Sequence, residues 1–289
     1  MKRLIKWAAI FMLFLAGVAI LAVVLLNVIP GSPLTVAFDV QPETILIPTD
    51  GASIAHGRYL AESVLVCVVC HGEDLAGKEM IDDPFRYIHT PNLTTGAGGV
   101  GQTYSDADWV RAIRHGVDPE GHGLIFMPTD HYFHLSDADL GAVIAYMKSL
   151  APVDNTAPGL ALNPVVTALL NSGQSGEVVR ARVIDHDAKR PSPPADYGAY
   201  LVKIGGCDFC HGLDLTGGQG PEPGAPPAPN ITASGPWGQR TFAEFAHTLR
   251  TGIMPGGQPI NPAFMPWVGY GRMTDEDLMA IWSYLQSLN

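Results

Sequence analysis

The chain contains the same order of short motifs twice, first between Gly57 and Leu150 and again between Gly198 and Leu288. Gly57-Arg58-Tyr59-Leu60 returns as Gly198-Ala199-Tyr200-Leu201, Pro91-Asn92-Leu93-Thr94 as Pro229-Asn230-Ile231-Thr232, and Phe126-Met127-Pro128 as Phe264-Met265-Pro266. A repeat of this length indicates two homologous folded units rather than one large core. We predict a first domain over residues 51–152 and a second over 193–289, joined by a connector over 153–192.

Each copy has the pattern of a helical domain. Ser105 with Asp108 three residues later predicts a capped helix that ends at Gly116, and Thr241 with Glu244 predicts its counterpart ending at Gly252. A closing helix in each copy has apolar residues three and four positions apart, namely Leu140, Val143, Ile144, Met147 and Leu150, then Leu278, Ile281, Trp282, Leu285 and Leu288. No comparable alternating strand pattern is present. The predicted class is therefore all-α, and Val165 to Leu170 in the connector reads as a brief helix between the domains.

Residues 1–30 read as a transmembrane anchor. Trp7 to Ile29 is apolar except for Asn27, and as a helix it would rise roughly 35 Å, enough to cross a bilayer. Basic residues precede it at Lys2, Arg3 and Lys6, so the positive-inside rule predicts a single pass through the cytoplasmic (inner) membrane, with residues 31–50 as a juxtamembrane segment and the later domains on the periplasmic side. The alternative is a cleaved secretory signal, which would also export the domains.

The exported part is acidic. Without Lys2, Arg3 and Lys6 the chain has 14 basic and 28 acidic residues, a net charge of −14. Nucleic acid is therefore not an expected partner. An acidic surface favours protein partners with basic docking surfaces.

The strongest chemical signal is Cys-x-x-Cys-His, present as Cys67, Cys70, His71 and again as Cys207, Cys210, His211. Two thiols three positions apart on a helical turn can form thioethers with both vinyl groups of one haem, while the next imidazole reaches the iron. All four cysteines of the chain lie in these motifs. The sequence predicts two covalently bound haem c groups with His71 and His211 as iron ligands.

Three other interpretations of the motif are weaker. A zinc ribbon needs two cysteine pairs separated by a short loop, a thioredoxin-like dithiol needs alternating strands and helices, and a structural disulfide leaves the histidine after each pair unexplained.

The second axial ligand is expected to be a methionine. Of nine methionines only Met127 has a methionine at the equivalent position of the other copy, Met265, and both follow their motif histidine at nearly the same spacing and come just before a proline. Three histidines of the same loop compete with Met127, and Met254 competes with Met265; the histidines are His122, His131 and His134. A thioether favours reduced iron and leaves no open coordination position, as an electron carrier requires.

The chain resembles the class I cytochrome c fold in duplicate, and is most similar to the cytochrome c subunits of membrane-bound alcohol, gluconate and sugar dehydrogenases. The resemblance lies in Thr90-Pro91-Asn92-Leu93-Thr94, in the helix from Ser105 to Gly116, and in the Met127-Pro128 loop. Those subunits usually have three haem motifs and this chain has two. The resemblance implies that the carbonyls of Pro91 and Pro229 accept the proton of the proximal imidazole, and that the helix with Gly57 crosses the closing helix.

These features together predict a membrane-anchored electron carrier with no catalytic residues of its own. It would pass electrons from a membrane-associated donor to an acceptor, as a free carrier or as a subunit of a dehydrogenase, respiratory or photosynthetic complex. The alternative function is a dihaem peroxidase or a gas-binding haem sensor, which needs one iron with a free or displaceable ligand.

Overall fold

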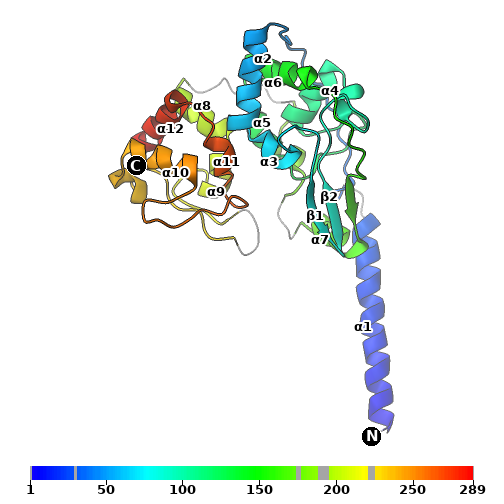
Figure 1. Cartoon of the computed structure of the whole chain (residues 1–289). Coiled ribbons are helices and arrows are strands. Elements are labelled where there is room, and N and C mark those ends of the chain that lie inside the picture. The colour runs from blue at the N-terminus through cyan, green and yellow to red at the C-terminus, as the bar shows by residue number, and fades with distance from the viewer. Residues whose placement is uncertain (1, 29–30, 174–176, 188–194, 221–224, 289) are drawn as a thin grey trace.

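The computed structural model describes residues 2–28, 31–173, 177–187, 195–220 and 225–288, and two helical domains follow a long N-terminal helix (Figure 1). The long helix is α1 (Lys2–Val28). The first domain contains α2 (Gly51–Tyr59), η1 (Leu60–Val64), α3 (Cys67–His71), β1 (Glu79–Asp83), β2 (Arg86–His89), η2 (Val100–Gln102), α4 (Asp106–Val110), η3 (Arg111–His115), α5 (Thr129–Tyr132) and α6 (Asp137–Ser149). The segment between the domains contains β3 (Leu160–Leu162), α7 (Pro164–Asn171) and η4 (Arg180–Val183), and the second domain contains α8 (Tyr197–Ile204), α9 (Cys207–His211), η5 (Pro236–Gln239), α10 (Phe242–Thr251), α11 (Trp267–Tyr270) and α12 (Asp275–Ser287).

The two domains share one arrangement of helices, and the predicted helical class is confirmed. In the first, α2 crosses α6, and a Cβ on Gly57 would lie 1.9 Å from the carbonyl oxygen of Ala142. In the second, α8 crosses α12, and a Cβ on Gly198 would lie 2.1 Å from the carbonyl oxygen of Ala280. Only glycine permits this close approach of two helix backbones. The capping boxes at Ser105 and Thr241 are also present, as predicted.

A small sheet, which the sequence did not predict, accompanies the first domain. Its strand order is β1-β2-β3, with both pairs antiparallel and Ile81 opposite Ile88. The strands are too short to give a clear alternating pattern, and β3 comes from the connector far along the chain. The sheet is therefore an addition to a helical fold.

The connector forms its predicted helix, but in a different place from the one expected. Asn163 caps α7, its side chain accepting hydrogen bonds from the amides of Val165 and Val166. The helix packs against the C-terminal end of α1 rather than between the domains (Figure 1). Residues 174–176 and 188–192 of the connector, and the domain boundaries expected at 30 and 193, lie outside the described residues.

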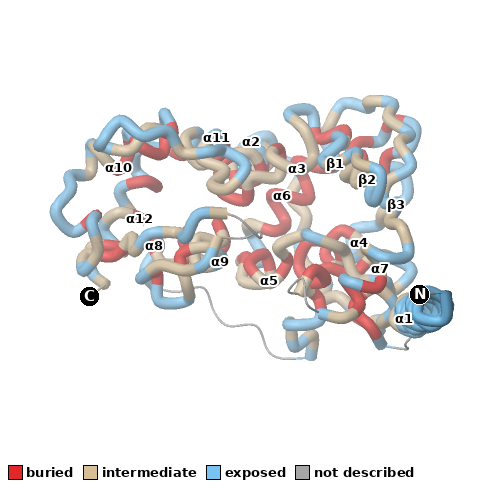
Figure 2. Tube along the Cα trace, turned by 90° about the horizontal axis from the view of Figure 1, so that it is seen from below, coloured by how far each residue is buried: buried red, intermediate tan, exposed pale blue. Residues whose placement is uncertain are grey.

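The domains share one buried core. One cluster of buried side chains runs through both, and Figure 2 shows buried residues in each domain and in the region between them. A smaller cluster, around Val117, Leu170 and Val179, joins the first domain to the connector. The two domains therefore pack together as one body rather than as two separate domains joined by a linker.

Polar contacts between the domains are reciprocal. Tyr59 donates its hydroxyl hydrogen to Asp277 of α12 (2.5 Å) and accepts a hydrogen bond from the amide of Thr274 (3.1 Å). Tyr200 does the same in the opposite direction, donating to Asp139 of α6 (2.5 Å) and accepting from the amide of Ser136 (3.0 Å). Tyr59 and Tyr200 occupy equivalent positions of the repeat. Each domain thus contributes one tyrosine to the start of the other's closing helix, as a pseudo-twofold relation requires.

We predict that the two tyrosine hydroxyls couple the unfolding of the domains. Replacing Tyr59 and Tyr200 by Phe removes both bonds to carboxylates and should cost about 1–2 kcal/mol each. Urea unfolding of the full chain, followed by tryptophan fluorescence, should change from one transition to two. Tyr87→Phe, a control in β2 away from the domain interface, should keep a single transition; if the double variant also keeps one, the hydroxyls do not couple the domains.

Candidate functional site

The two Cys-x-x-Cys-His motifs form two short helices of identical extent. In α3 and in α9 the cysteines are the first and fourth residues and the histidine is the last. A residue in the left-handed region precedes each helix, Val66 (φ 49°) in the first domain and Gly206 (φ 68°) in the second. All four thiols are free of disulfide bonds. Each motif therefore has two thiols one helical turn apart and an adjacent imidazole.

The turn after each motif is also duplicated, and it holds the histidine in place. The amides of Gly77 and Gly217 each donate to the carbonyl of the motif histidine, both at 2.8 Å. Within these turns Leu75 and Leu215 are buried and have positive φ angles, 57° and 63°. A buried leucine in this conformation is strained, and the same strain at both motifs indicates that the turn geometry is required there.

Both motif histidines use one ring nitrogen in the same way. Nδ1 of His71 donates to the carbonyl of Pro91 (2.9 Å), and Nδ1 of His211 donates to the carbonyl of Pro229 (2.8 Å). Burial lowers the pKa of each histidine, while the hydrogen bond to the carbonyl acts in the opposite direction. Each ring is then neutral with its proton on Nδ1, which leaves the lone pair of Nε2 for a metal. This donor set, beside two thiols, fits a covalently attached haem.

The thiols do not have the properties of a redox dithiol. Burial raises the pKa of Cys67 and of Cys207 to about 12. Reactive dithiols need a lowered pKa, because the thiolate is the active form. Within the described ranges, no three His, Cys, Asp or Glu side chains converge as a metal-ion site.

The segment after each of Met127 and Met265 is hydrogen-bonded to the residues before the motif through a tyrosine, which is buried in the first domain and partly buried in the second. Met127 and Met265 are partly buried against the core, and each precedes a proline that starts a short helix, α5 or α11. Tyr132 at the end of α5 donates to the carbonyl of Leu65, and Tyr270 at the end of α11 donates to that of Gly205, both at 2.7 Å. Each accepting carbonyl lies two residues before the first motif cysteine. The sequence interpretation missed these tyrosines, although their equal spacing after both methionines was a usable signal.

The competing histidines have other contacts. His122 is exposed and lies 3.2 Å from Asp118, while buried His131 turns toward the second domain, 3.3 Å from Asp208 and edge-on to Phe209. His134 is half-buried beside Phe133. The residue before Met127 is Phe126, which has a positive φ of 63°. The equivalent Phe264, before Met265, has no positive φ, so this strain belongs to the first domain alone.

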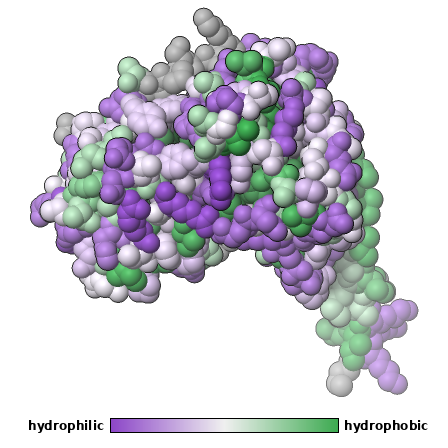
Figure 3. Space-filling model, turned by 45° about the horizontal axis from the view of Figure 1, so that its top comes forward, coloured by the Kyte–Doolittle hydropathy of each residue, from purple (hydrophilic) through white to green (hydrophobic). Residues whose placement is uncertain are grey.

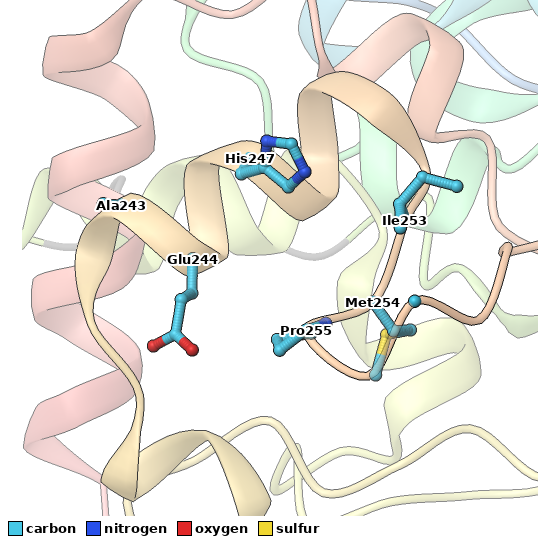
Figure 4. Close-up of a pocket in the computed structure, with 7 residues that line it drawn as sticks. Ala243, Glu244, His247, Ile253, Met254 and Pro255 are labelled. Atoms are coloured by element: carbon cyan, nitrogen blue, oxygen red, sulfur yellow. The ribbon is translucent and has the colours of Figure 1, made fainter.

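Met254, the competitor of Met265, lines a separate surface pocket of about 460 Å³ (Figure 4). The pocket lies between α10 and the loop that follows, with Glu244 and His247 on one side and Ile253 and Pro255 on the other. Among the described residues that line it there is no member of the second motif and no part of the Met265 loop.

Fold and site together define a c-type haem protein with two haem domains. The family model for cytochrome c matches residues 54–151 and 195–289, and the chain belongs to the cytochrome c family. It binds two haem c groups covalently and is an electron-transfer protein rather than a catalytic subunit. The expectations of fold, cofactor and function class are thereby confirmed.

Relatives of known name agree with this assignment. The chain is 30% identical to the fructose dehydrogenase cytochrome subunit of Gluconobacter japonicus, over 82% of this chain and 52% of that protein. It is 29% identical to a diheme cytochrome c-type protein of Cereibacter sphaeroides, over 92% of this chain and 95% of that one. It is 34% identical to the gluconate 2-dehydrogenase cytochrome c subunit of Pantoea cypripedii, over 55% and 38% respectively. The chain thus spans about half the length of the fructose dehydrogenase subunit.

We expect the Tyr132 hydroxyl to hold the Met127 loop in place. Tyr132→Phe leaves the carbonyl of Leu65 buried without this donor and should lower the free energy of unfolding by about 1–2 kcal/mol. Tyr270→Phe should cost a similar amount, because the second domain repeats the contact. Denaturant titration of the full chain gives both values, and losses no larger than for Tyr87→Phe would show that neither hydroxyl holds its loop.

Proposed function

We propose that the chain is a membrane-tethered dihaem carrier whose irons each have one histidine and one methionine ligand. Cys67 and Cys70, then Cys207 and Cys210, form the thioethers. The iron ligands are His71 with Met127 in the first domain and His211 with Met265 in the second. The carbonyls of Pro91 and Pro229 orient the two imidazoles. The observation that carries the proposal is the imidazole–carbonyl hydrogen bond, which is present at both motifs with nearly the same length.

The protein's part in the chemistry is to hold two ligands per iron rigidly. Haem iron supplies the reaction, a one-electron exchange between its ferric and ferrous states. The Nδ1–H to carbonyl bond fixes the ring orientation of each histidine and raises its basicity. The hydrogen bonds of Tyr132 and Tyr270 hold the loops of Met127 and Met265, and with them the methionine sulfur atoms, close to their motifs. A fully occupied iron exchanges electrons and leaves no position for peroxide or a gas.

Contacts across the domain interface favour electron transfer between the two haems. A Cβ on Gly269 of α11 would lie 2.4 Å from Cγ1 of Val66, the residue before the first motif. In the reciprocal contact, a Cβ on Gly206, the residue before the second motif, would lie 3.3 Å from the ring of His131 on α5. Each motif therefore begins at the interface, against the short helix (α11 or α5) that follows the other domain's methionine.

The contacts of α1 support an anchor that is retained. Among the described residues, α1 is the one helix long and apolar enough to cross a membrane, and Figure 3 shows it as a projecting apolar rod. Asn27 donates to the carbonyl of Pro164 (2.9 Å), and Asn171 donates to that of Leu26 (3.1 Å). A cleaved signal would not need such partners in the folded domain. With Lys2, Arg3 and Lys6 at the N-terminal end of α1, the haem domains lie on the periplasmic side of the cytoplasmic membrane.

A membrane dehydrogenase is the partner we favour as electron donor. Relatives of this chain include named cytochrome subunits of fructose and gluconate dehydrogenases. The net charge of −14 outside the anchor favours basic docking surfaces on the donor and the acceptor. Tethering confines the carrier to the membrane surface, where it raises the effective concentration for such a partner.

Replacing Met127 by Ala should leave haem attached but open the first iron. We expect the reduced variant to bind carbon monoxide rapidly at one haem and to have a lower potential there, because the thioether favours reduced iron. Ligand-binding spectra and a redox titration measure both effects, and Met254→Ala serves as the control that changes neither. Rapid binding in the unaltered protein would favour the peroxidase or sensor alternative instead.

Removing the first cysteine pair should abolish stable haem retention in that domain alone. The Cys67→Ala, Cys70→Ala variant should show one added haem by intact-protein mass measurement, where the unaltered chain shows two. The Cys207→Ala, Cys210→Ala variant is the matched counterpart. Two retained haems in either variant would contradict the thioether assignment.

A further inference from the structure

The connector helix α7 lies against the end of the membrane helix in both views of the chain (Figures 1 and 2). The side chains of Asn27 and Asn171 join the two helices through their hydrogen bonds to backbone carbonyls. The amide of Leu34, just after α1, also donates to Asn171 (3.2 Å). The start and the end of α7 are thus both fixed to the last turn of α1 and the residues after it.

Large apolar side chains are exposed around this contact. Val165 and Leu169, four positions apart on one face of α7, are 52% and 48% exposed, while Ala168 and Leu170 on the other side are buried. Leu160 of β3 and Phe85 of the β1–β2 turn are 43% and 60% exposed. The amide of Asn163, between β3 and α7, donates to the carbonyl of Phe85 (2.9 Å), so these elements are contiguous. We name the exposed side chains of Phe85, Leu160, Val165 and Leu169 the foot.

The connector part of the foot differs in composition from the rest of the chain. Charged residues make up 16% of the sequence, yet no residue between Asp154 and Glu177, the stretch that holds Leu160, Val165 and Leu169, is charged. Phe85, by contrast, has Asp83 and Arg86 beside it. Binding of a basic protein partner to the acidic surface would not require this uncharged stretch. An uncharged helix with exposed apolar side chains can enter the boundary between lipid headgroups and acyl chains without the cost of desolvating a charge.

The depth of the foot follows from the length of α1. The hydrocarbon core of a bilayer is about 30 Å thick, and the 27 residues of α1 extend about 40 Å as a helix. With Lys2, Arg3 and Lys6 held among the headgroups on one side, the last turn of α1 emerges at the headgroups of the other. Since α7 is hydrogen-bonded to that turn, it starts at the membrane surface.

We propose that the foot inserts into the outer interface of the bilayer that α1 crosses, so that the first domain is attached to the membrane at two places. The proposal rests on the retained anchor of the proposed function. A single helix followed by a loop would let the domain tilt freely. The foot fixes the first domain at the surface, whereas the second domain lies on the side away from α1 (Figure 1).

The experiment uses the full haem-loaded chain in phosphatidylcholine nanodiscs with a lipid-soluble carbene reagent, activated by light. Mass spectrometry of peptides then reports labelling at α1, at the foot, and at two control residues. Leu46 and Leu213 are 83% and 91% exposed, more than any residue of the foot. Exposure to water alone would therefore label these controls at least as strongly.

We expect α1 and the foot to be labelled several-fold more than Leu46 and Leu213. Leu169→Ser with Phe85→Ser should lower labelling across the foot without changing the haem spectrum, while Leu213→Ser should leave the pattern unchanged. Labelled α1 with a foot no more labelled than the controls overturns the foot and leaves the anchor intact. If the N-terminal peptide is absent from the mature chain, the anchor and the foot both fail.

Discussion

The hydrogen bond from a motif histidine to a proline carbonyl is the interaction on which each domain depends. It fixes the tautomer and ring orientation of an imidazole that burial keeps neutral, and it leaves Nε2 available as an iron ligand. Two neighbouring features support this hydrogen bond. The strained turn at Leu75 or Leu215 holds the backbone of the motif histidine. The tyrosine that follows each methionine joins the methionine loop to the residues before the motif. Haem attachment therefore uses positions that the backbone fixes in advance.

Because the domain is duplicated, the helices that cross the closing helices also join the two domains. Tyr59 and Tyr200 lie on the helices that cross the closing helices within each domain, and their hydroxyls reach the closing helix of the other domain. Burial, followed by the bond to Asp277, raises the pKa of Tyr59 to about 12, so this hydroxyl remains a donor through the physiological range. Because the interface brings the start of each motif against the other domain, the contacts that join the domains also set the distance between the haems.

The sequence was sufficient for features that depend on local spacing. The haem motifs and the capping boxes at Ser105 and Thr241 could be predicted because each depends on a few neighbouring residues. The helix crossing at Gly57 could be predicted from the resemblance to the cytochrome c family. Long-range pairings could not be predicted. The pairing of β2 with β3 joins the first domain to the connector, and the placement of α7 depends on its contact with α1. The axial role of the two methionines and the assignment of the haem attachments to Cys67, Cys70, Cys207 and Cys210 are still predictions.

The departures from the repeat are as informative as the repeat itself. Features present in both domains include the motifs with their turns and the reciprocal contacts at the interface between the domains, where two equivalent haems need equivalent surroundings. The first domain alone has the sheet and the preceding segment, in which Glu43 pairs with the buried guanidinium of Arg114 and with His115. Burial by itself would raise the pKa of Glu43, but the hydrogen bond from His115 and the charge of Arg114 outweigh it and lower that pKa, so this pairing persists well below neutral pH. These additions connect the first domain to the end of α1. The asymmetric parts of the chain thus join a symmetric pair of haem domains to the N-terminal helix.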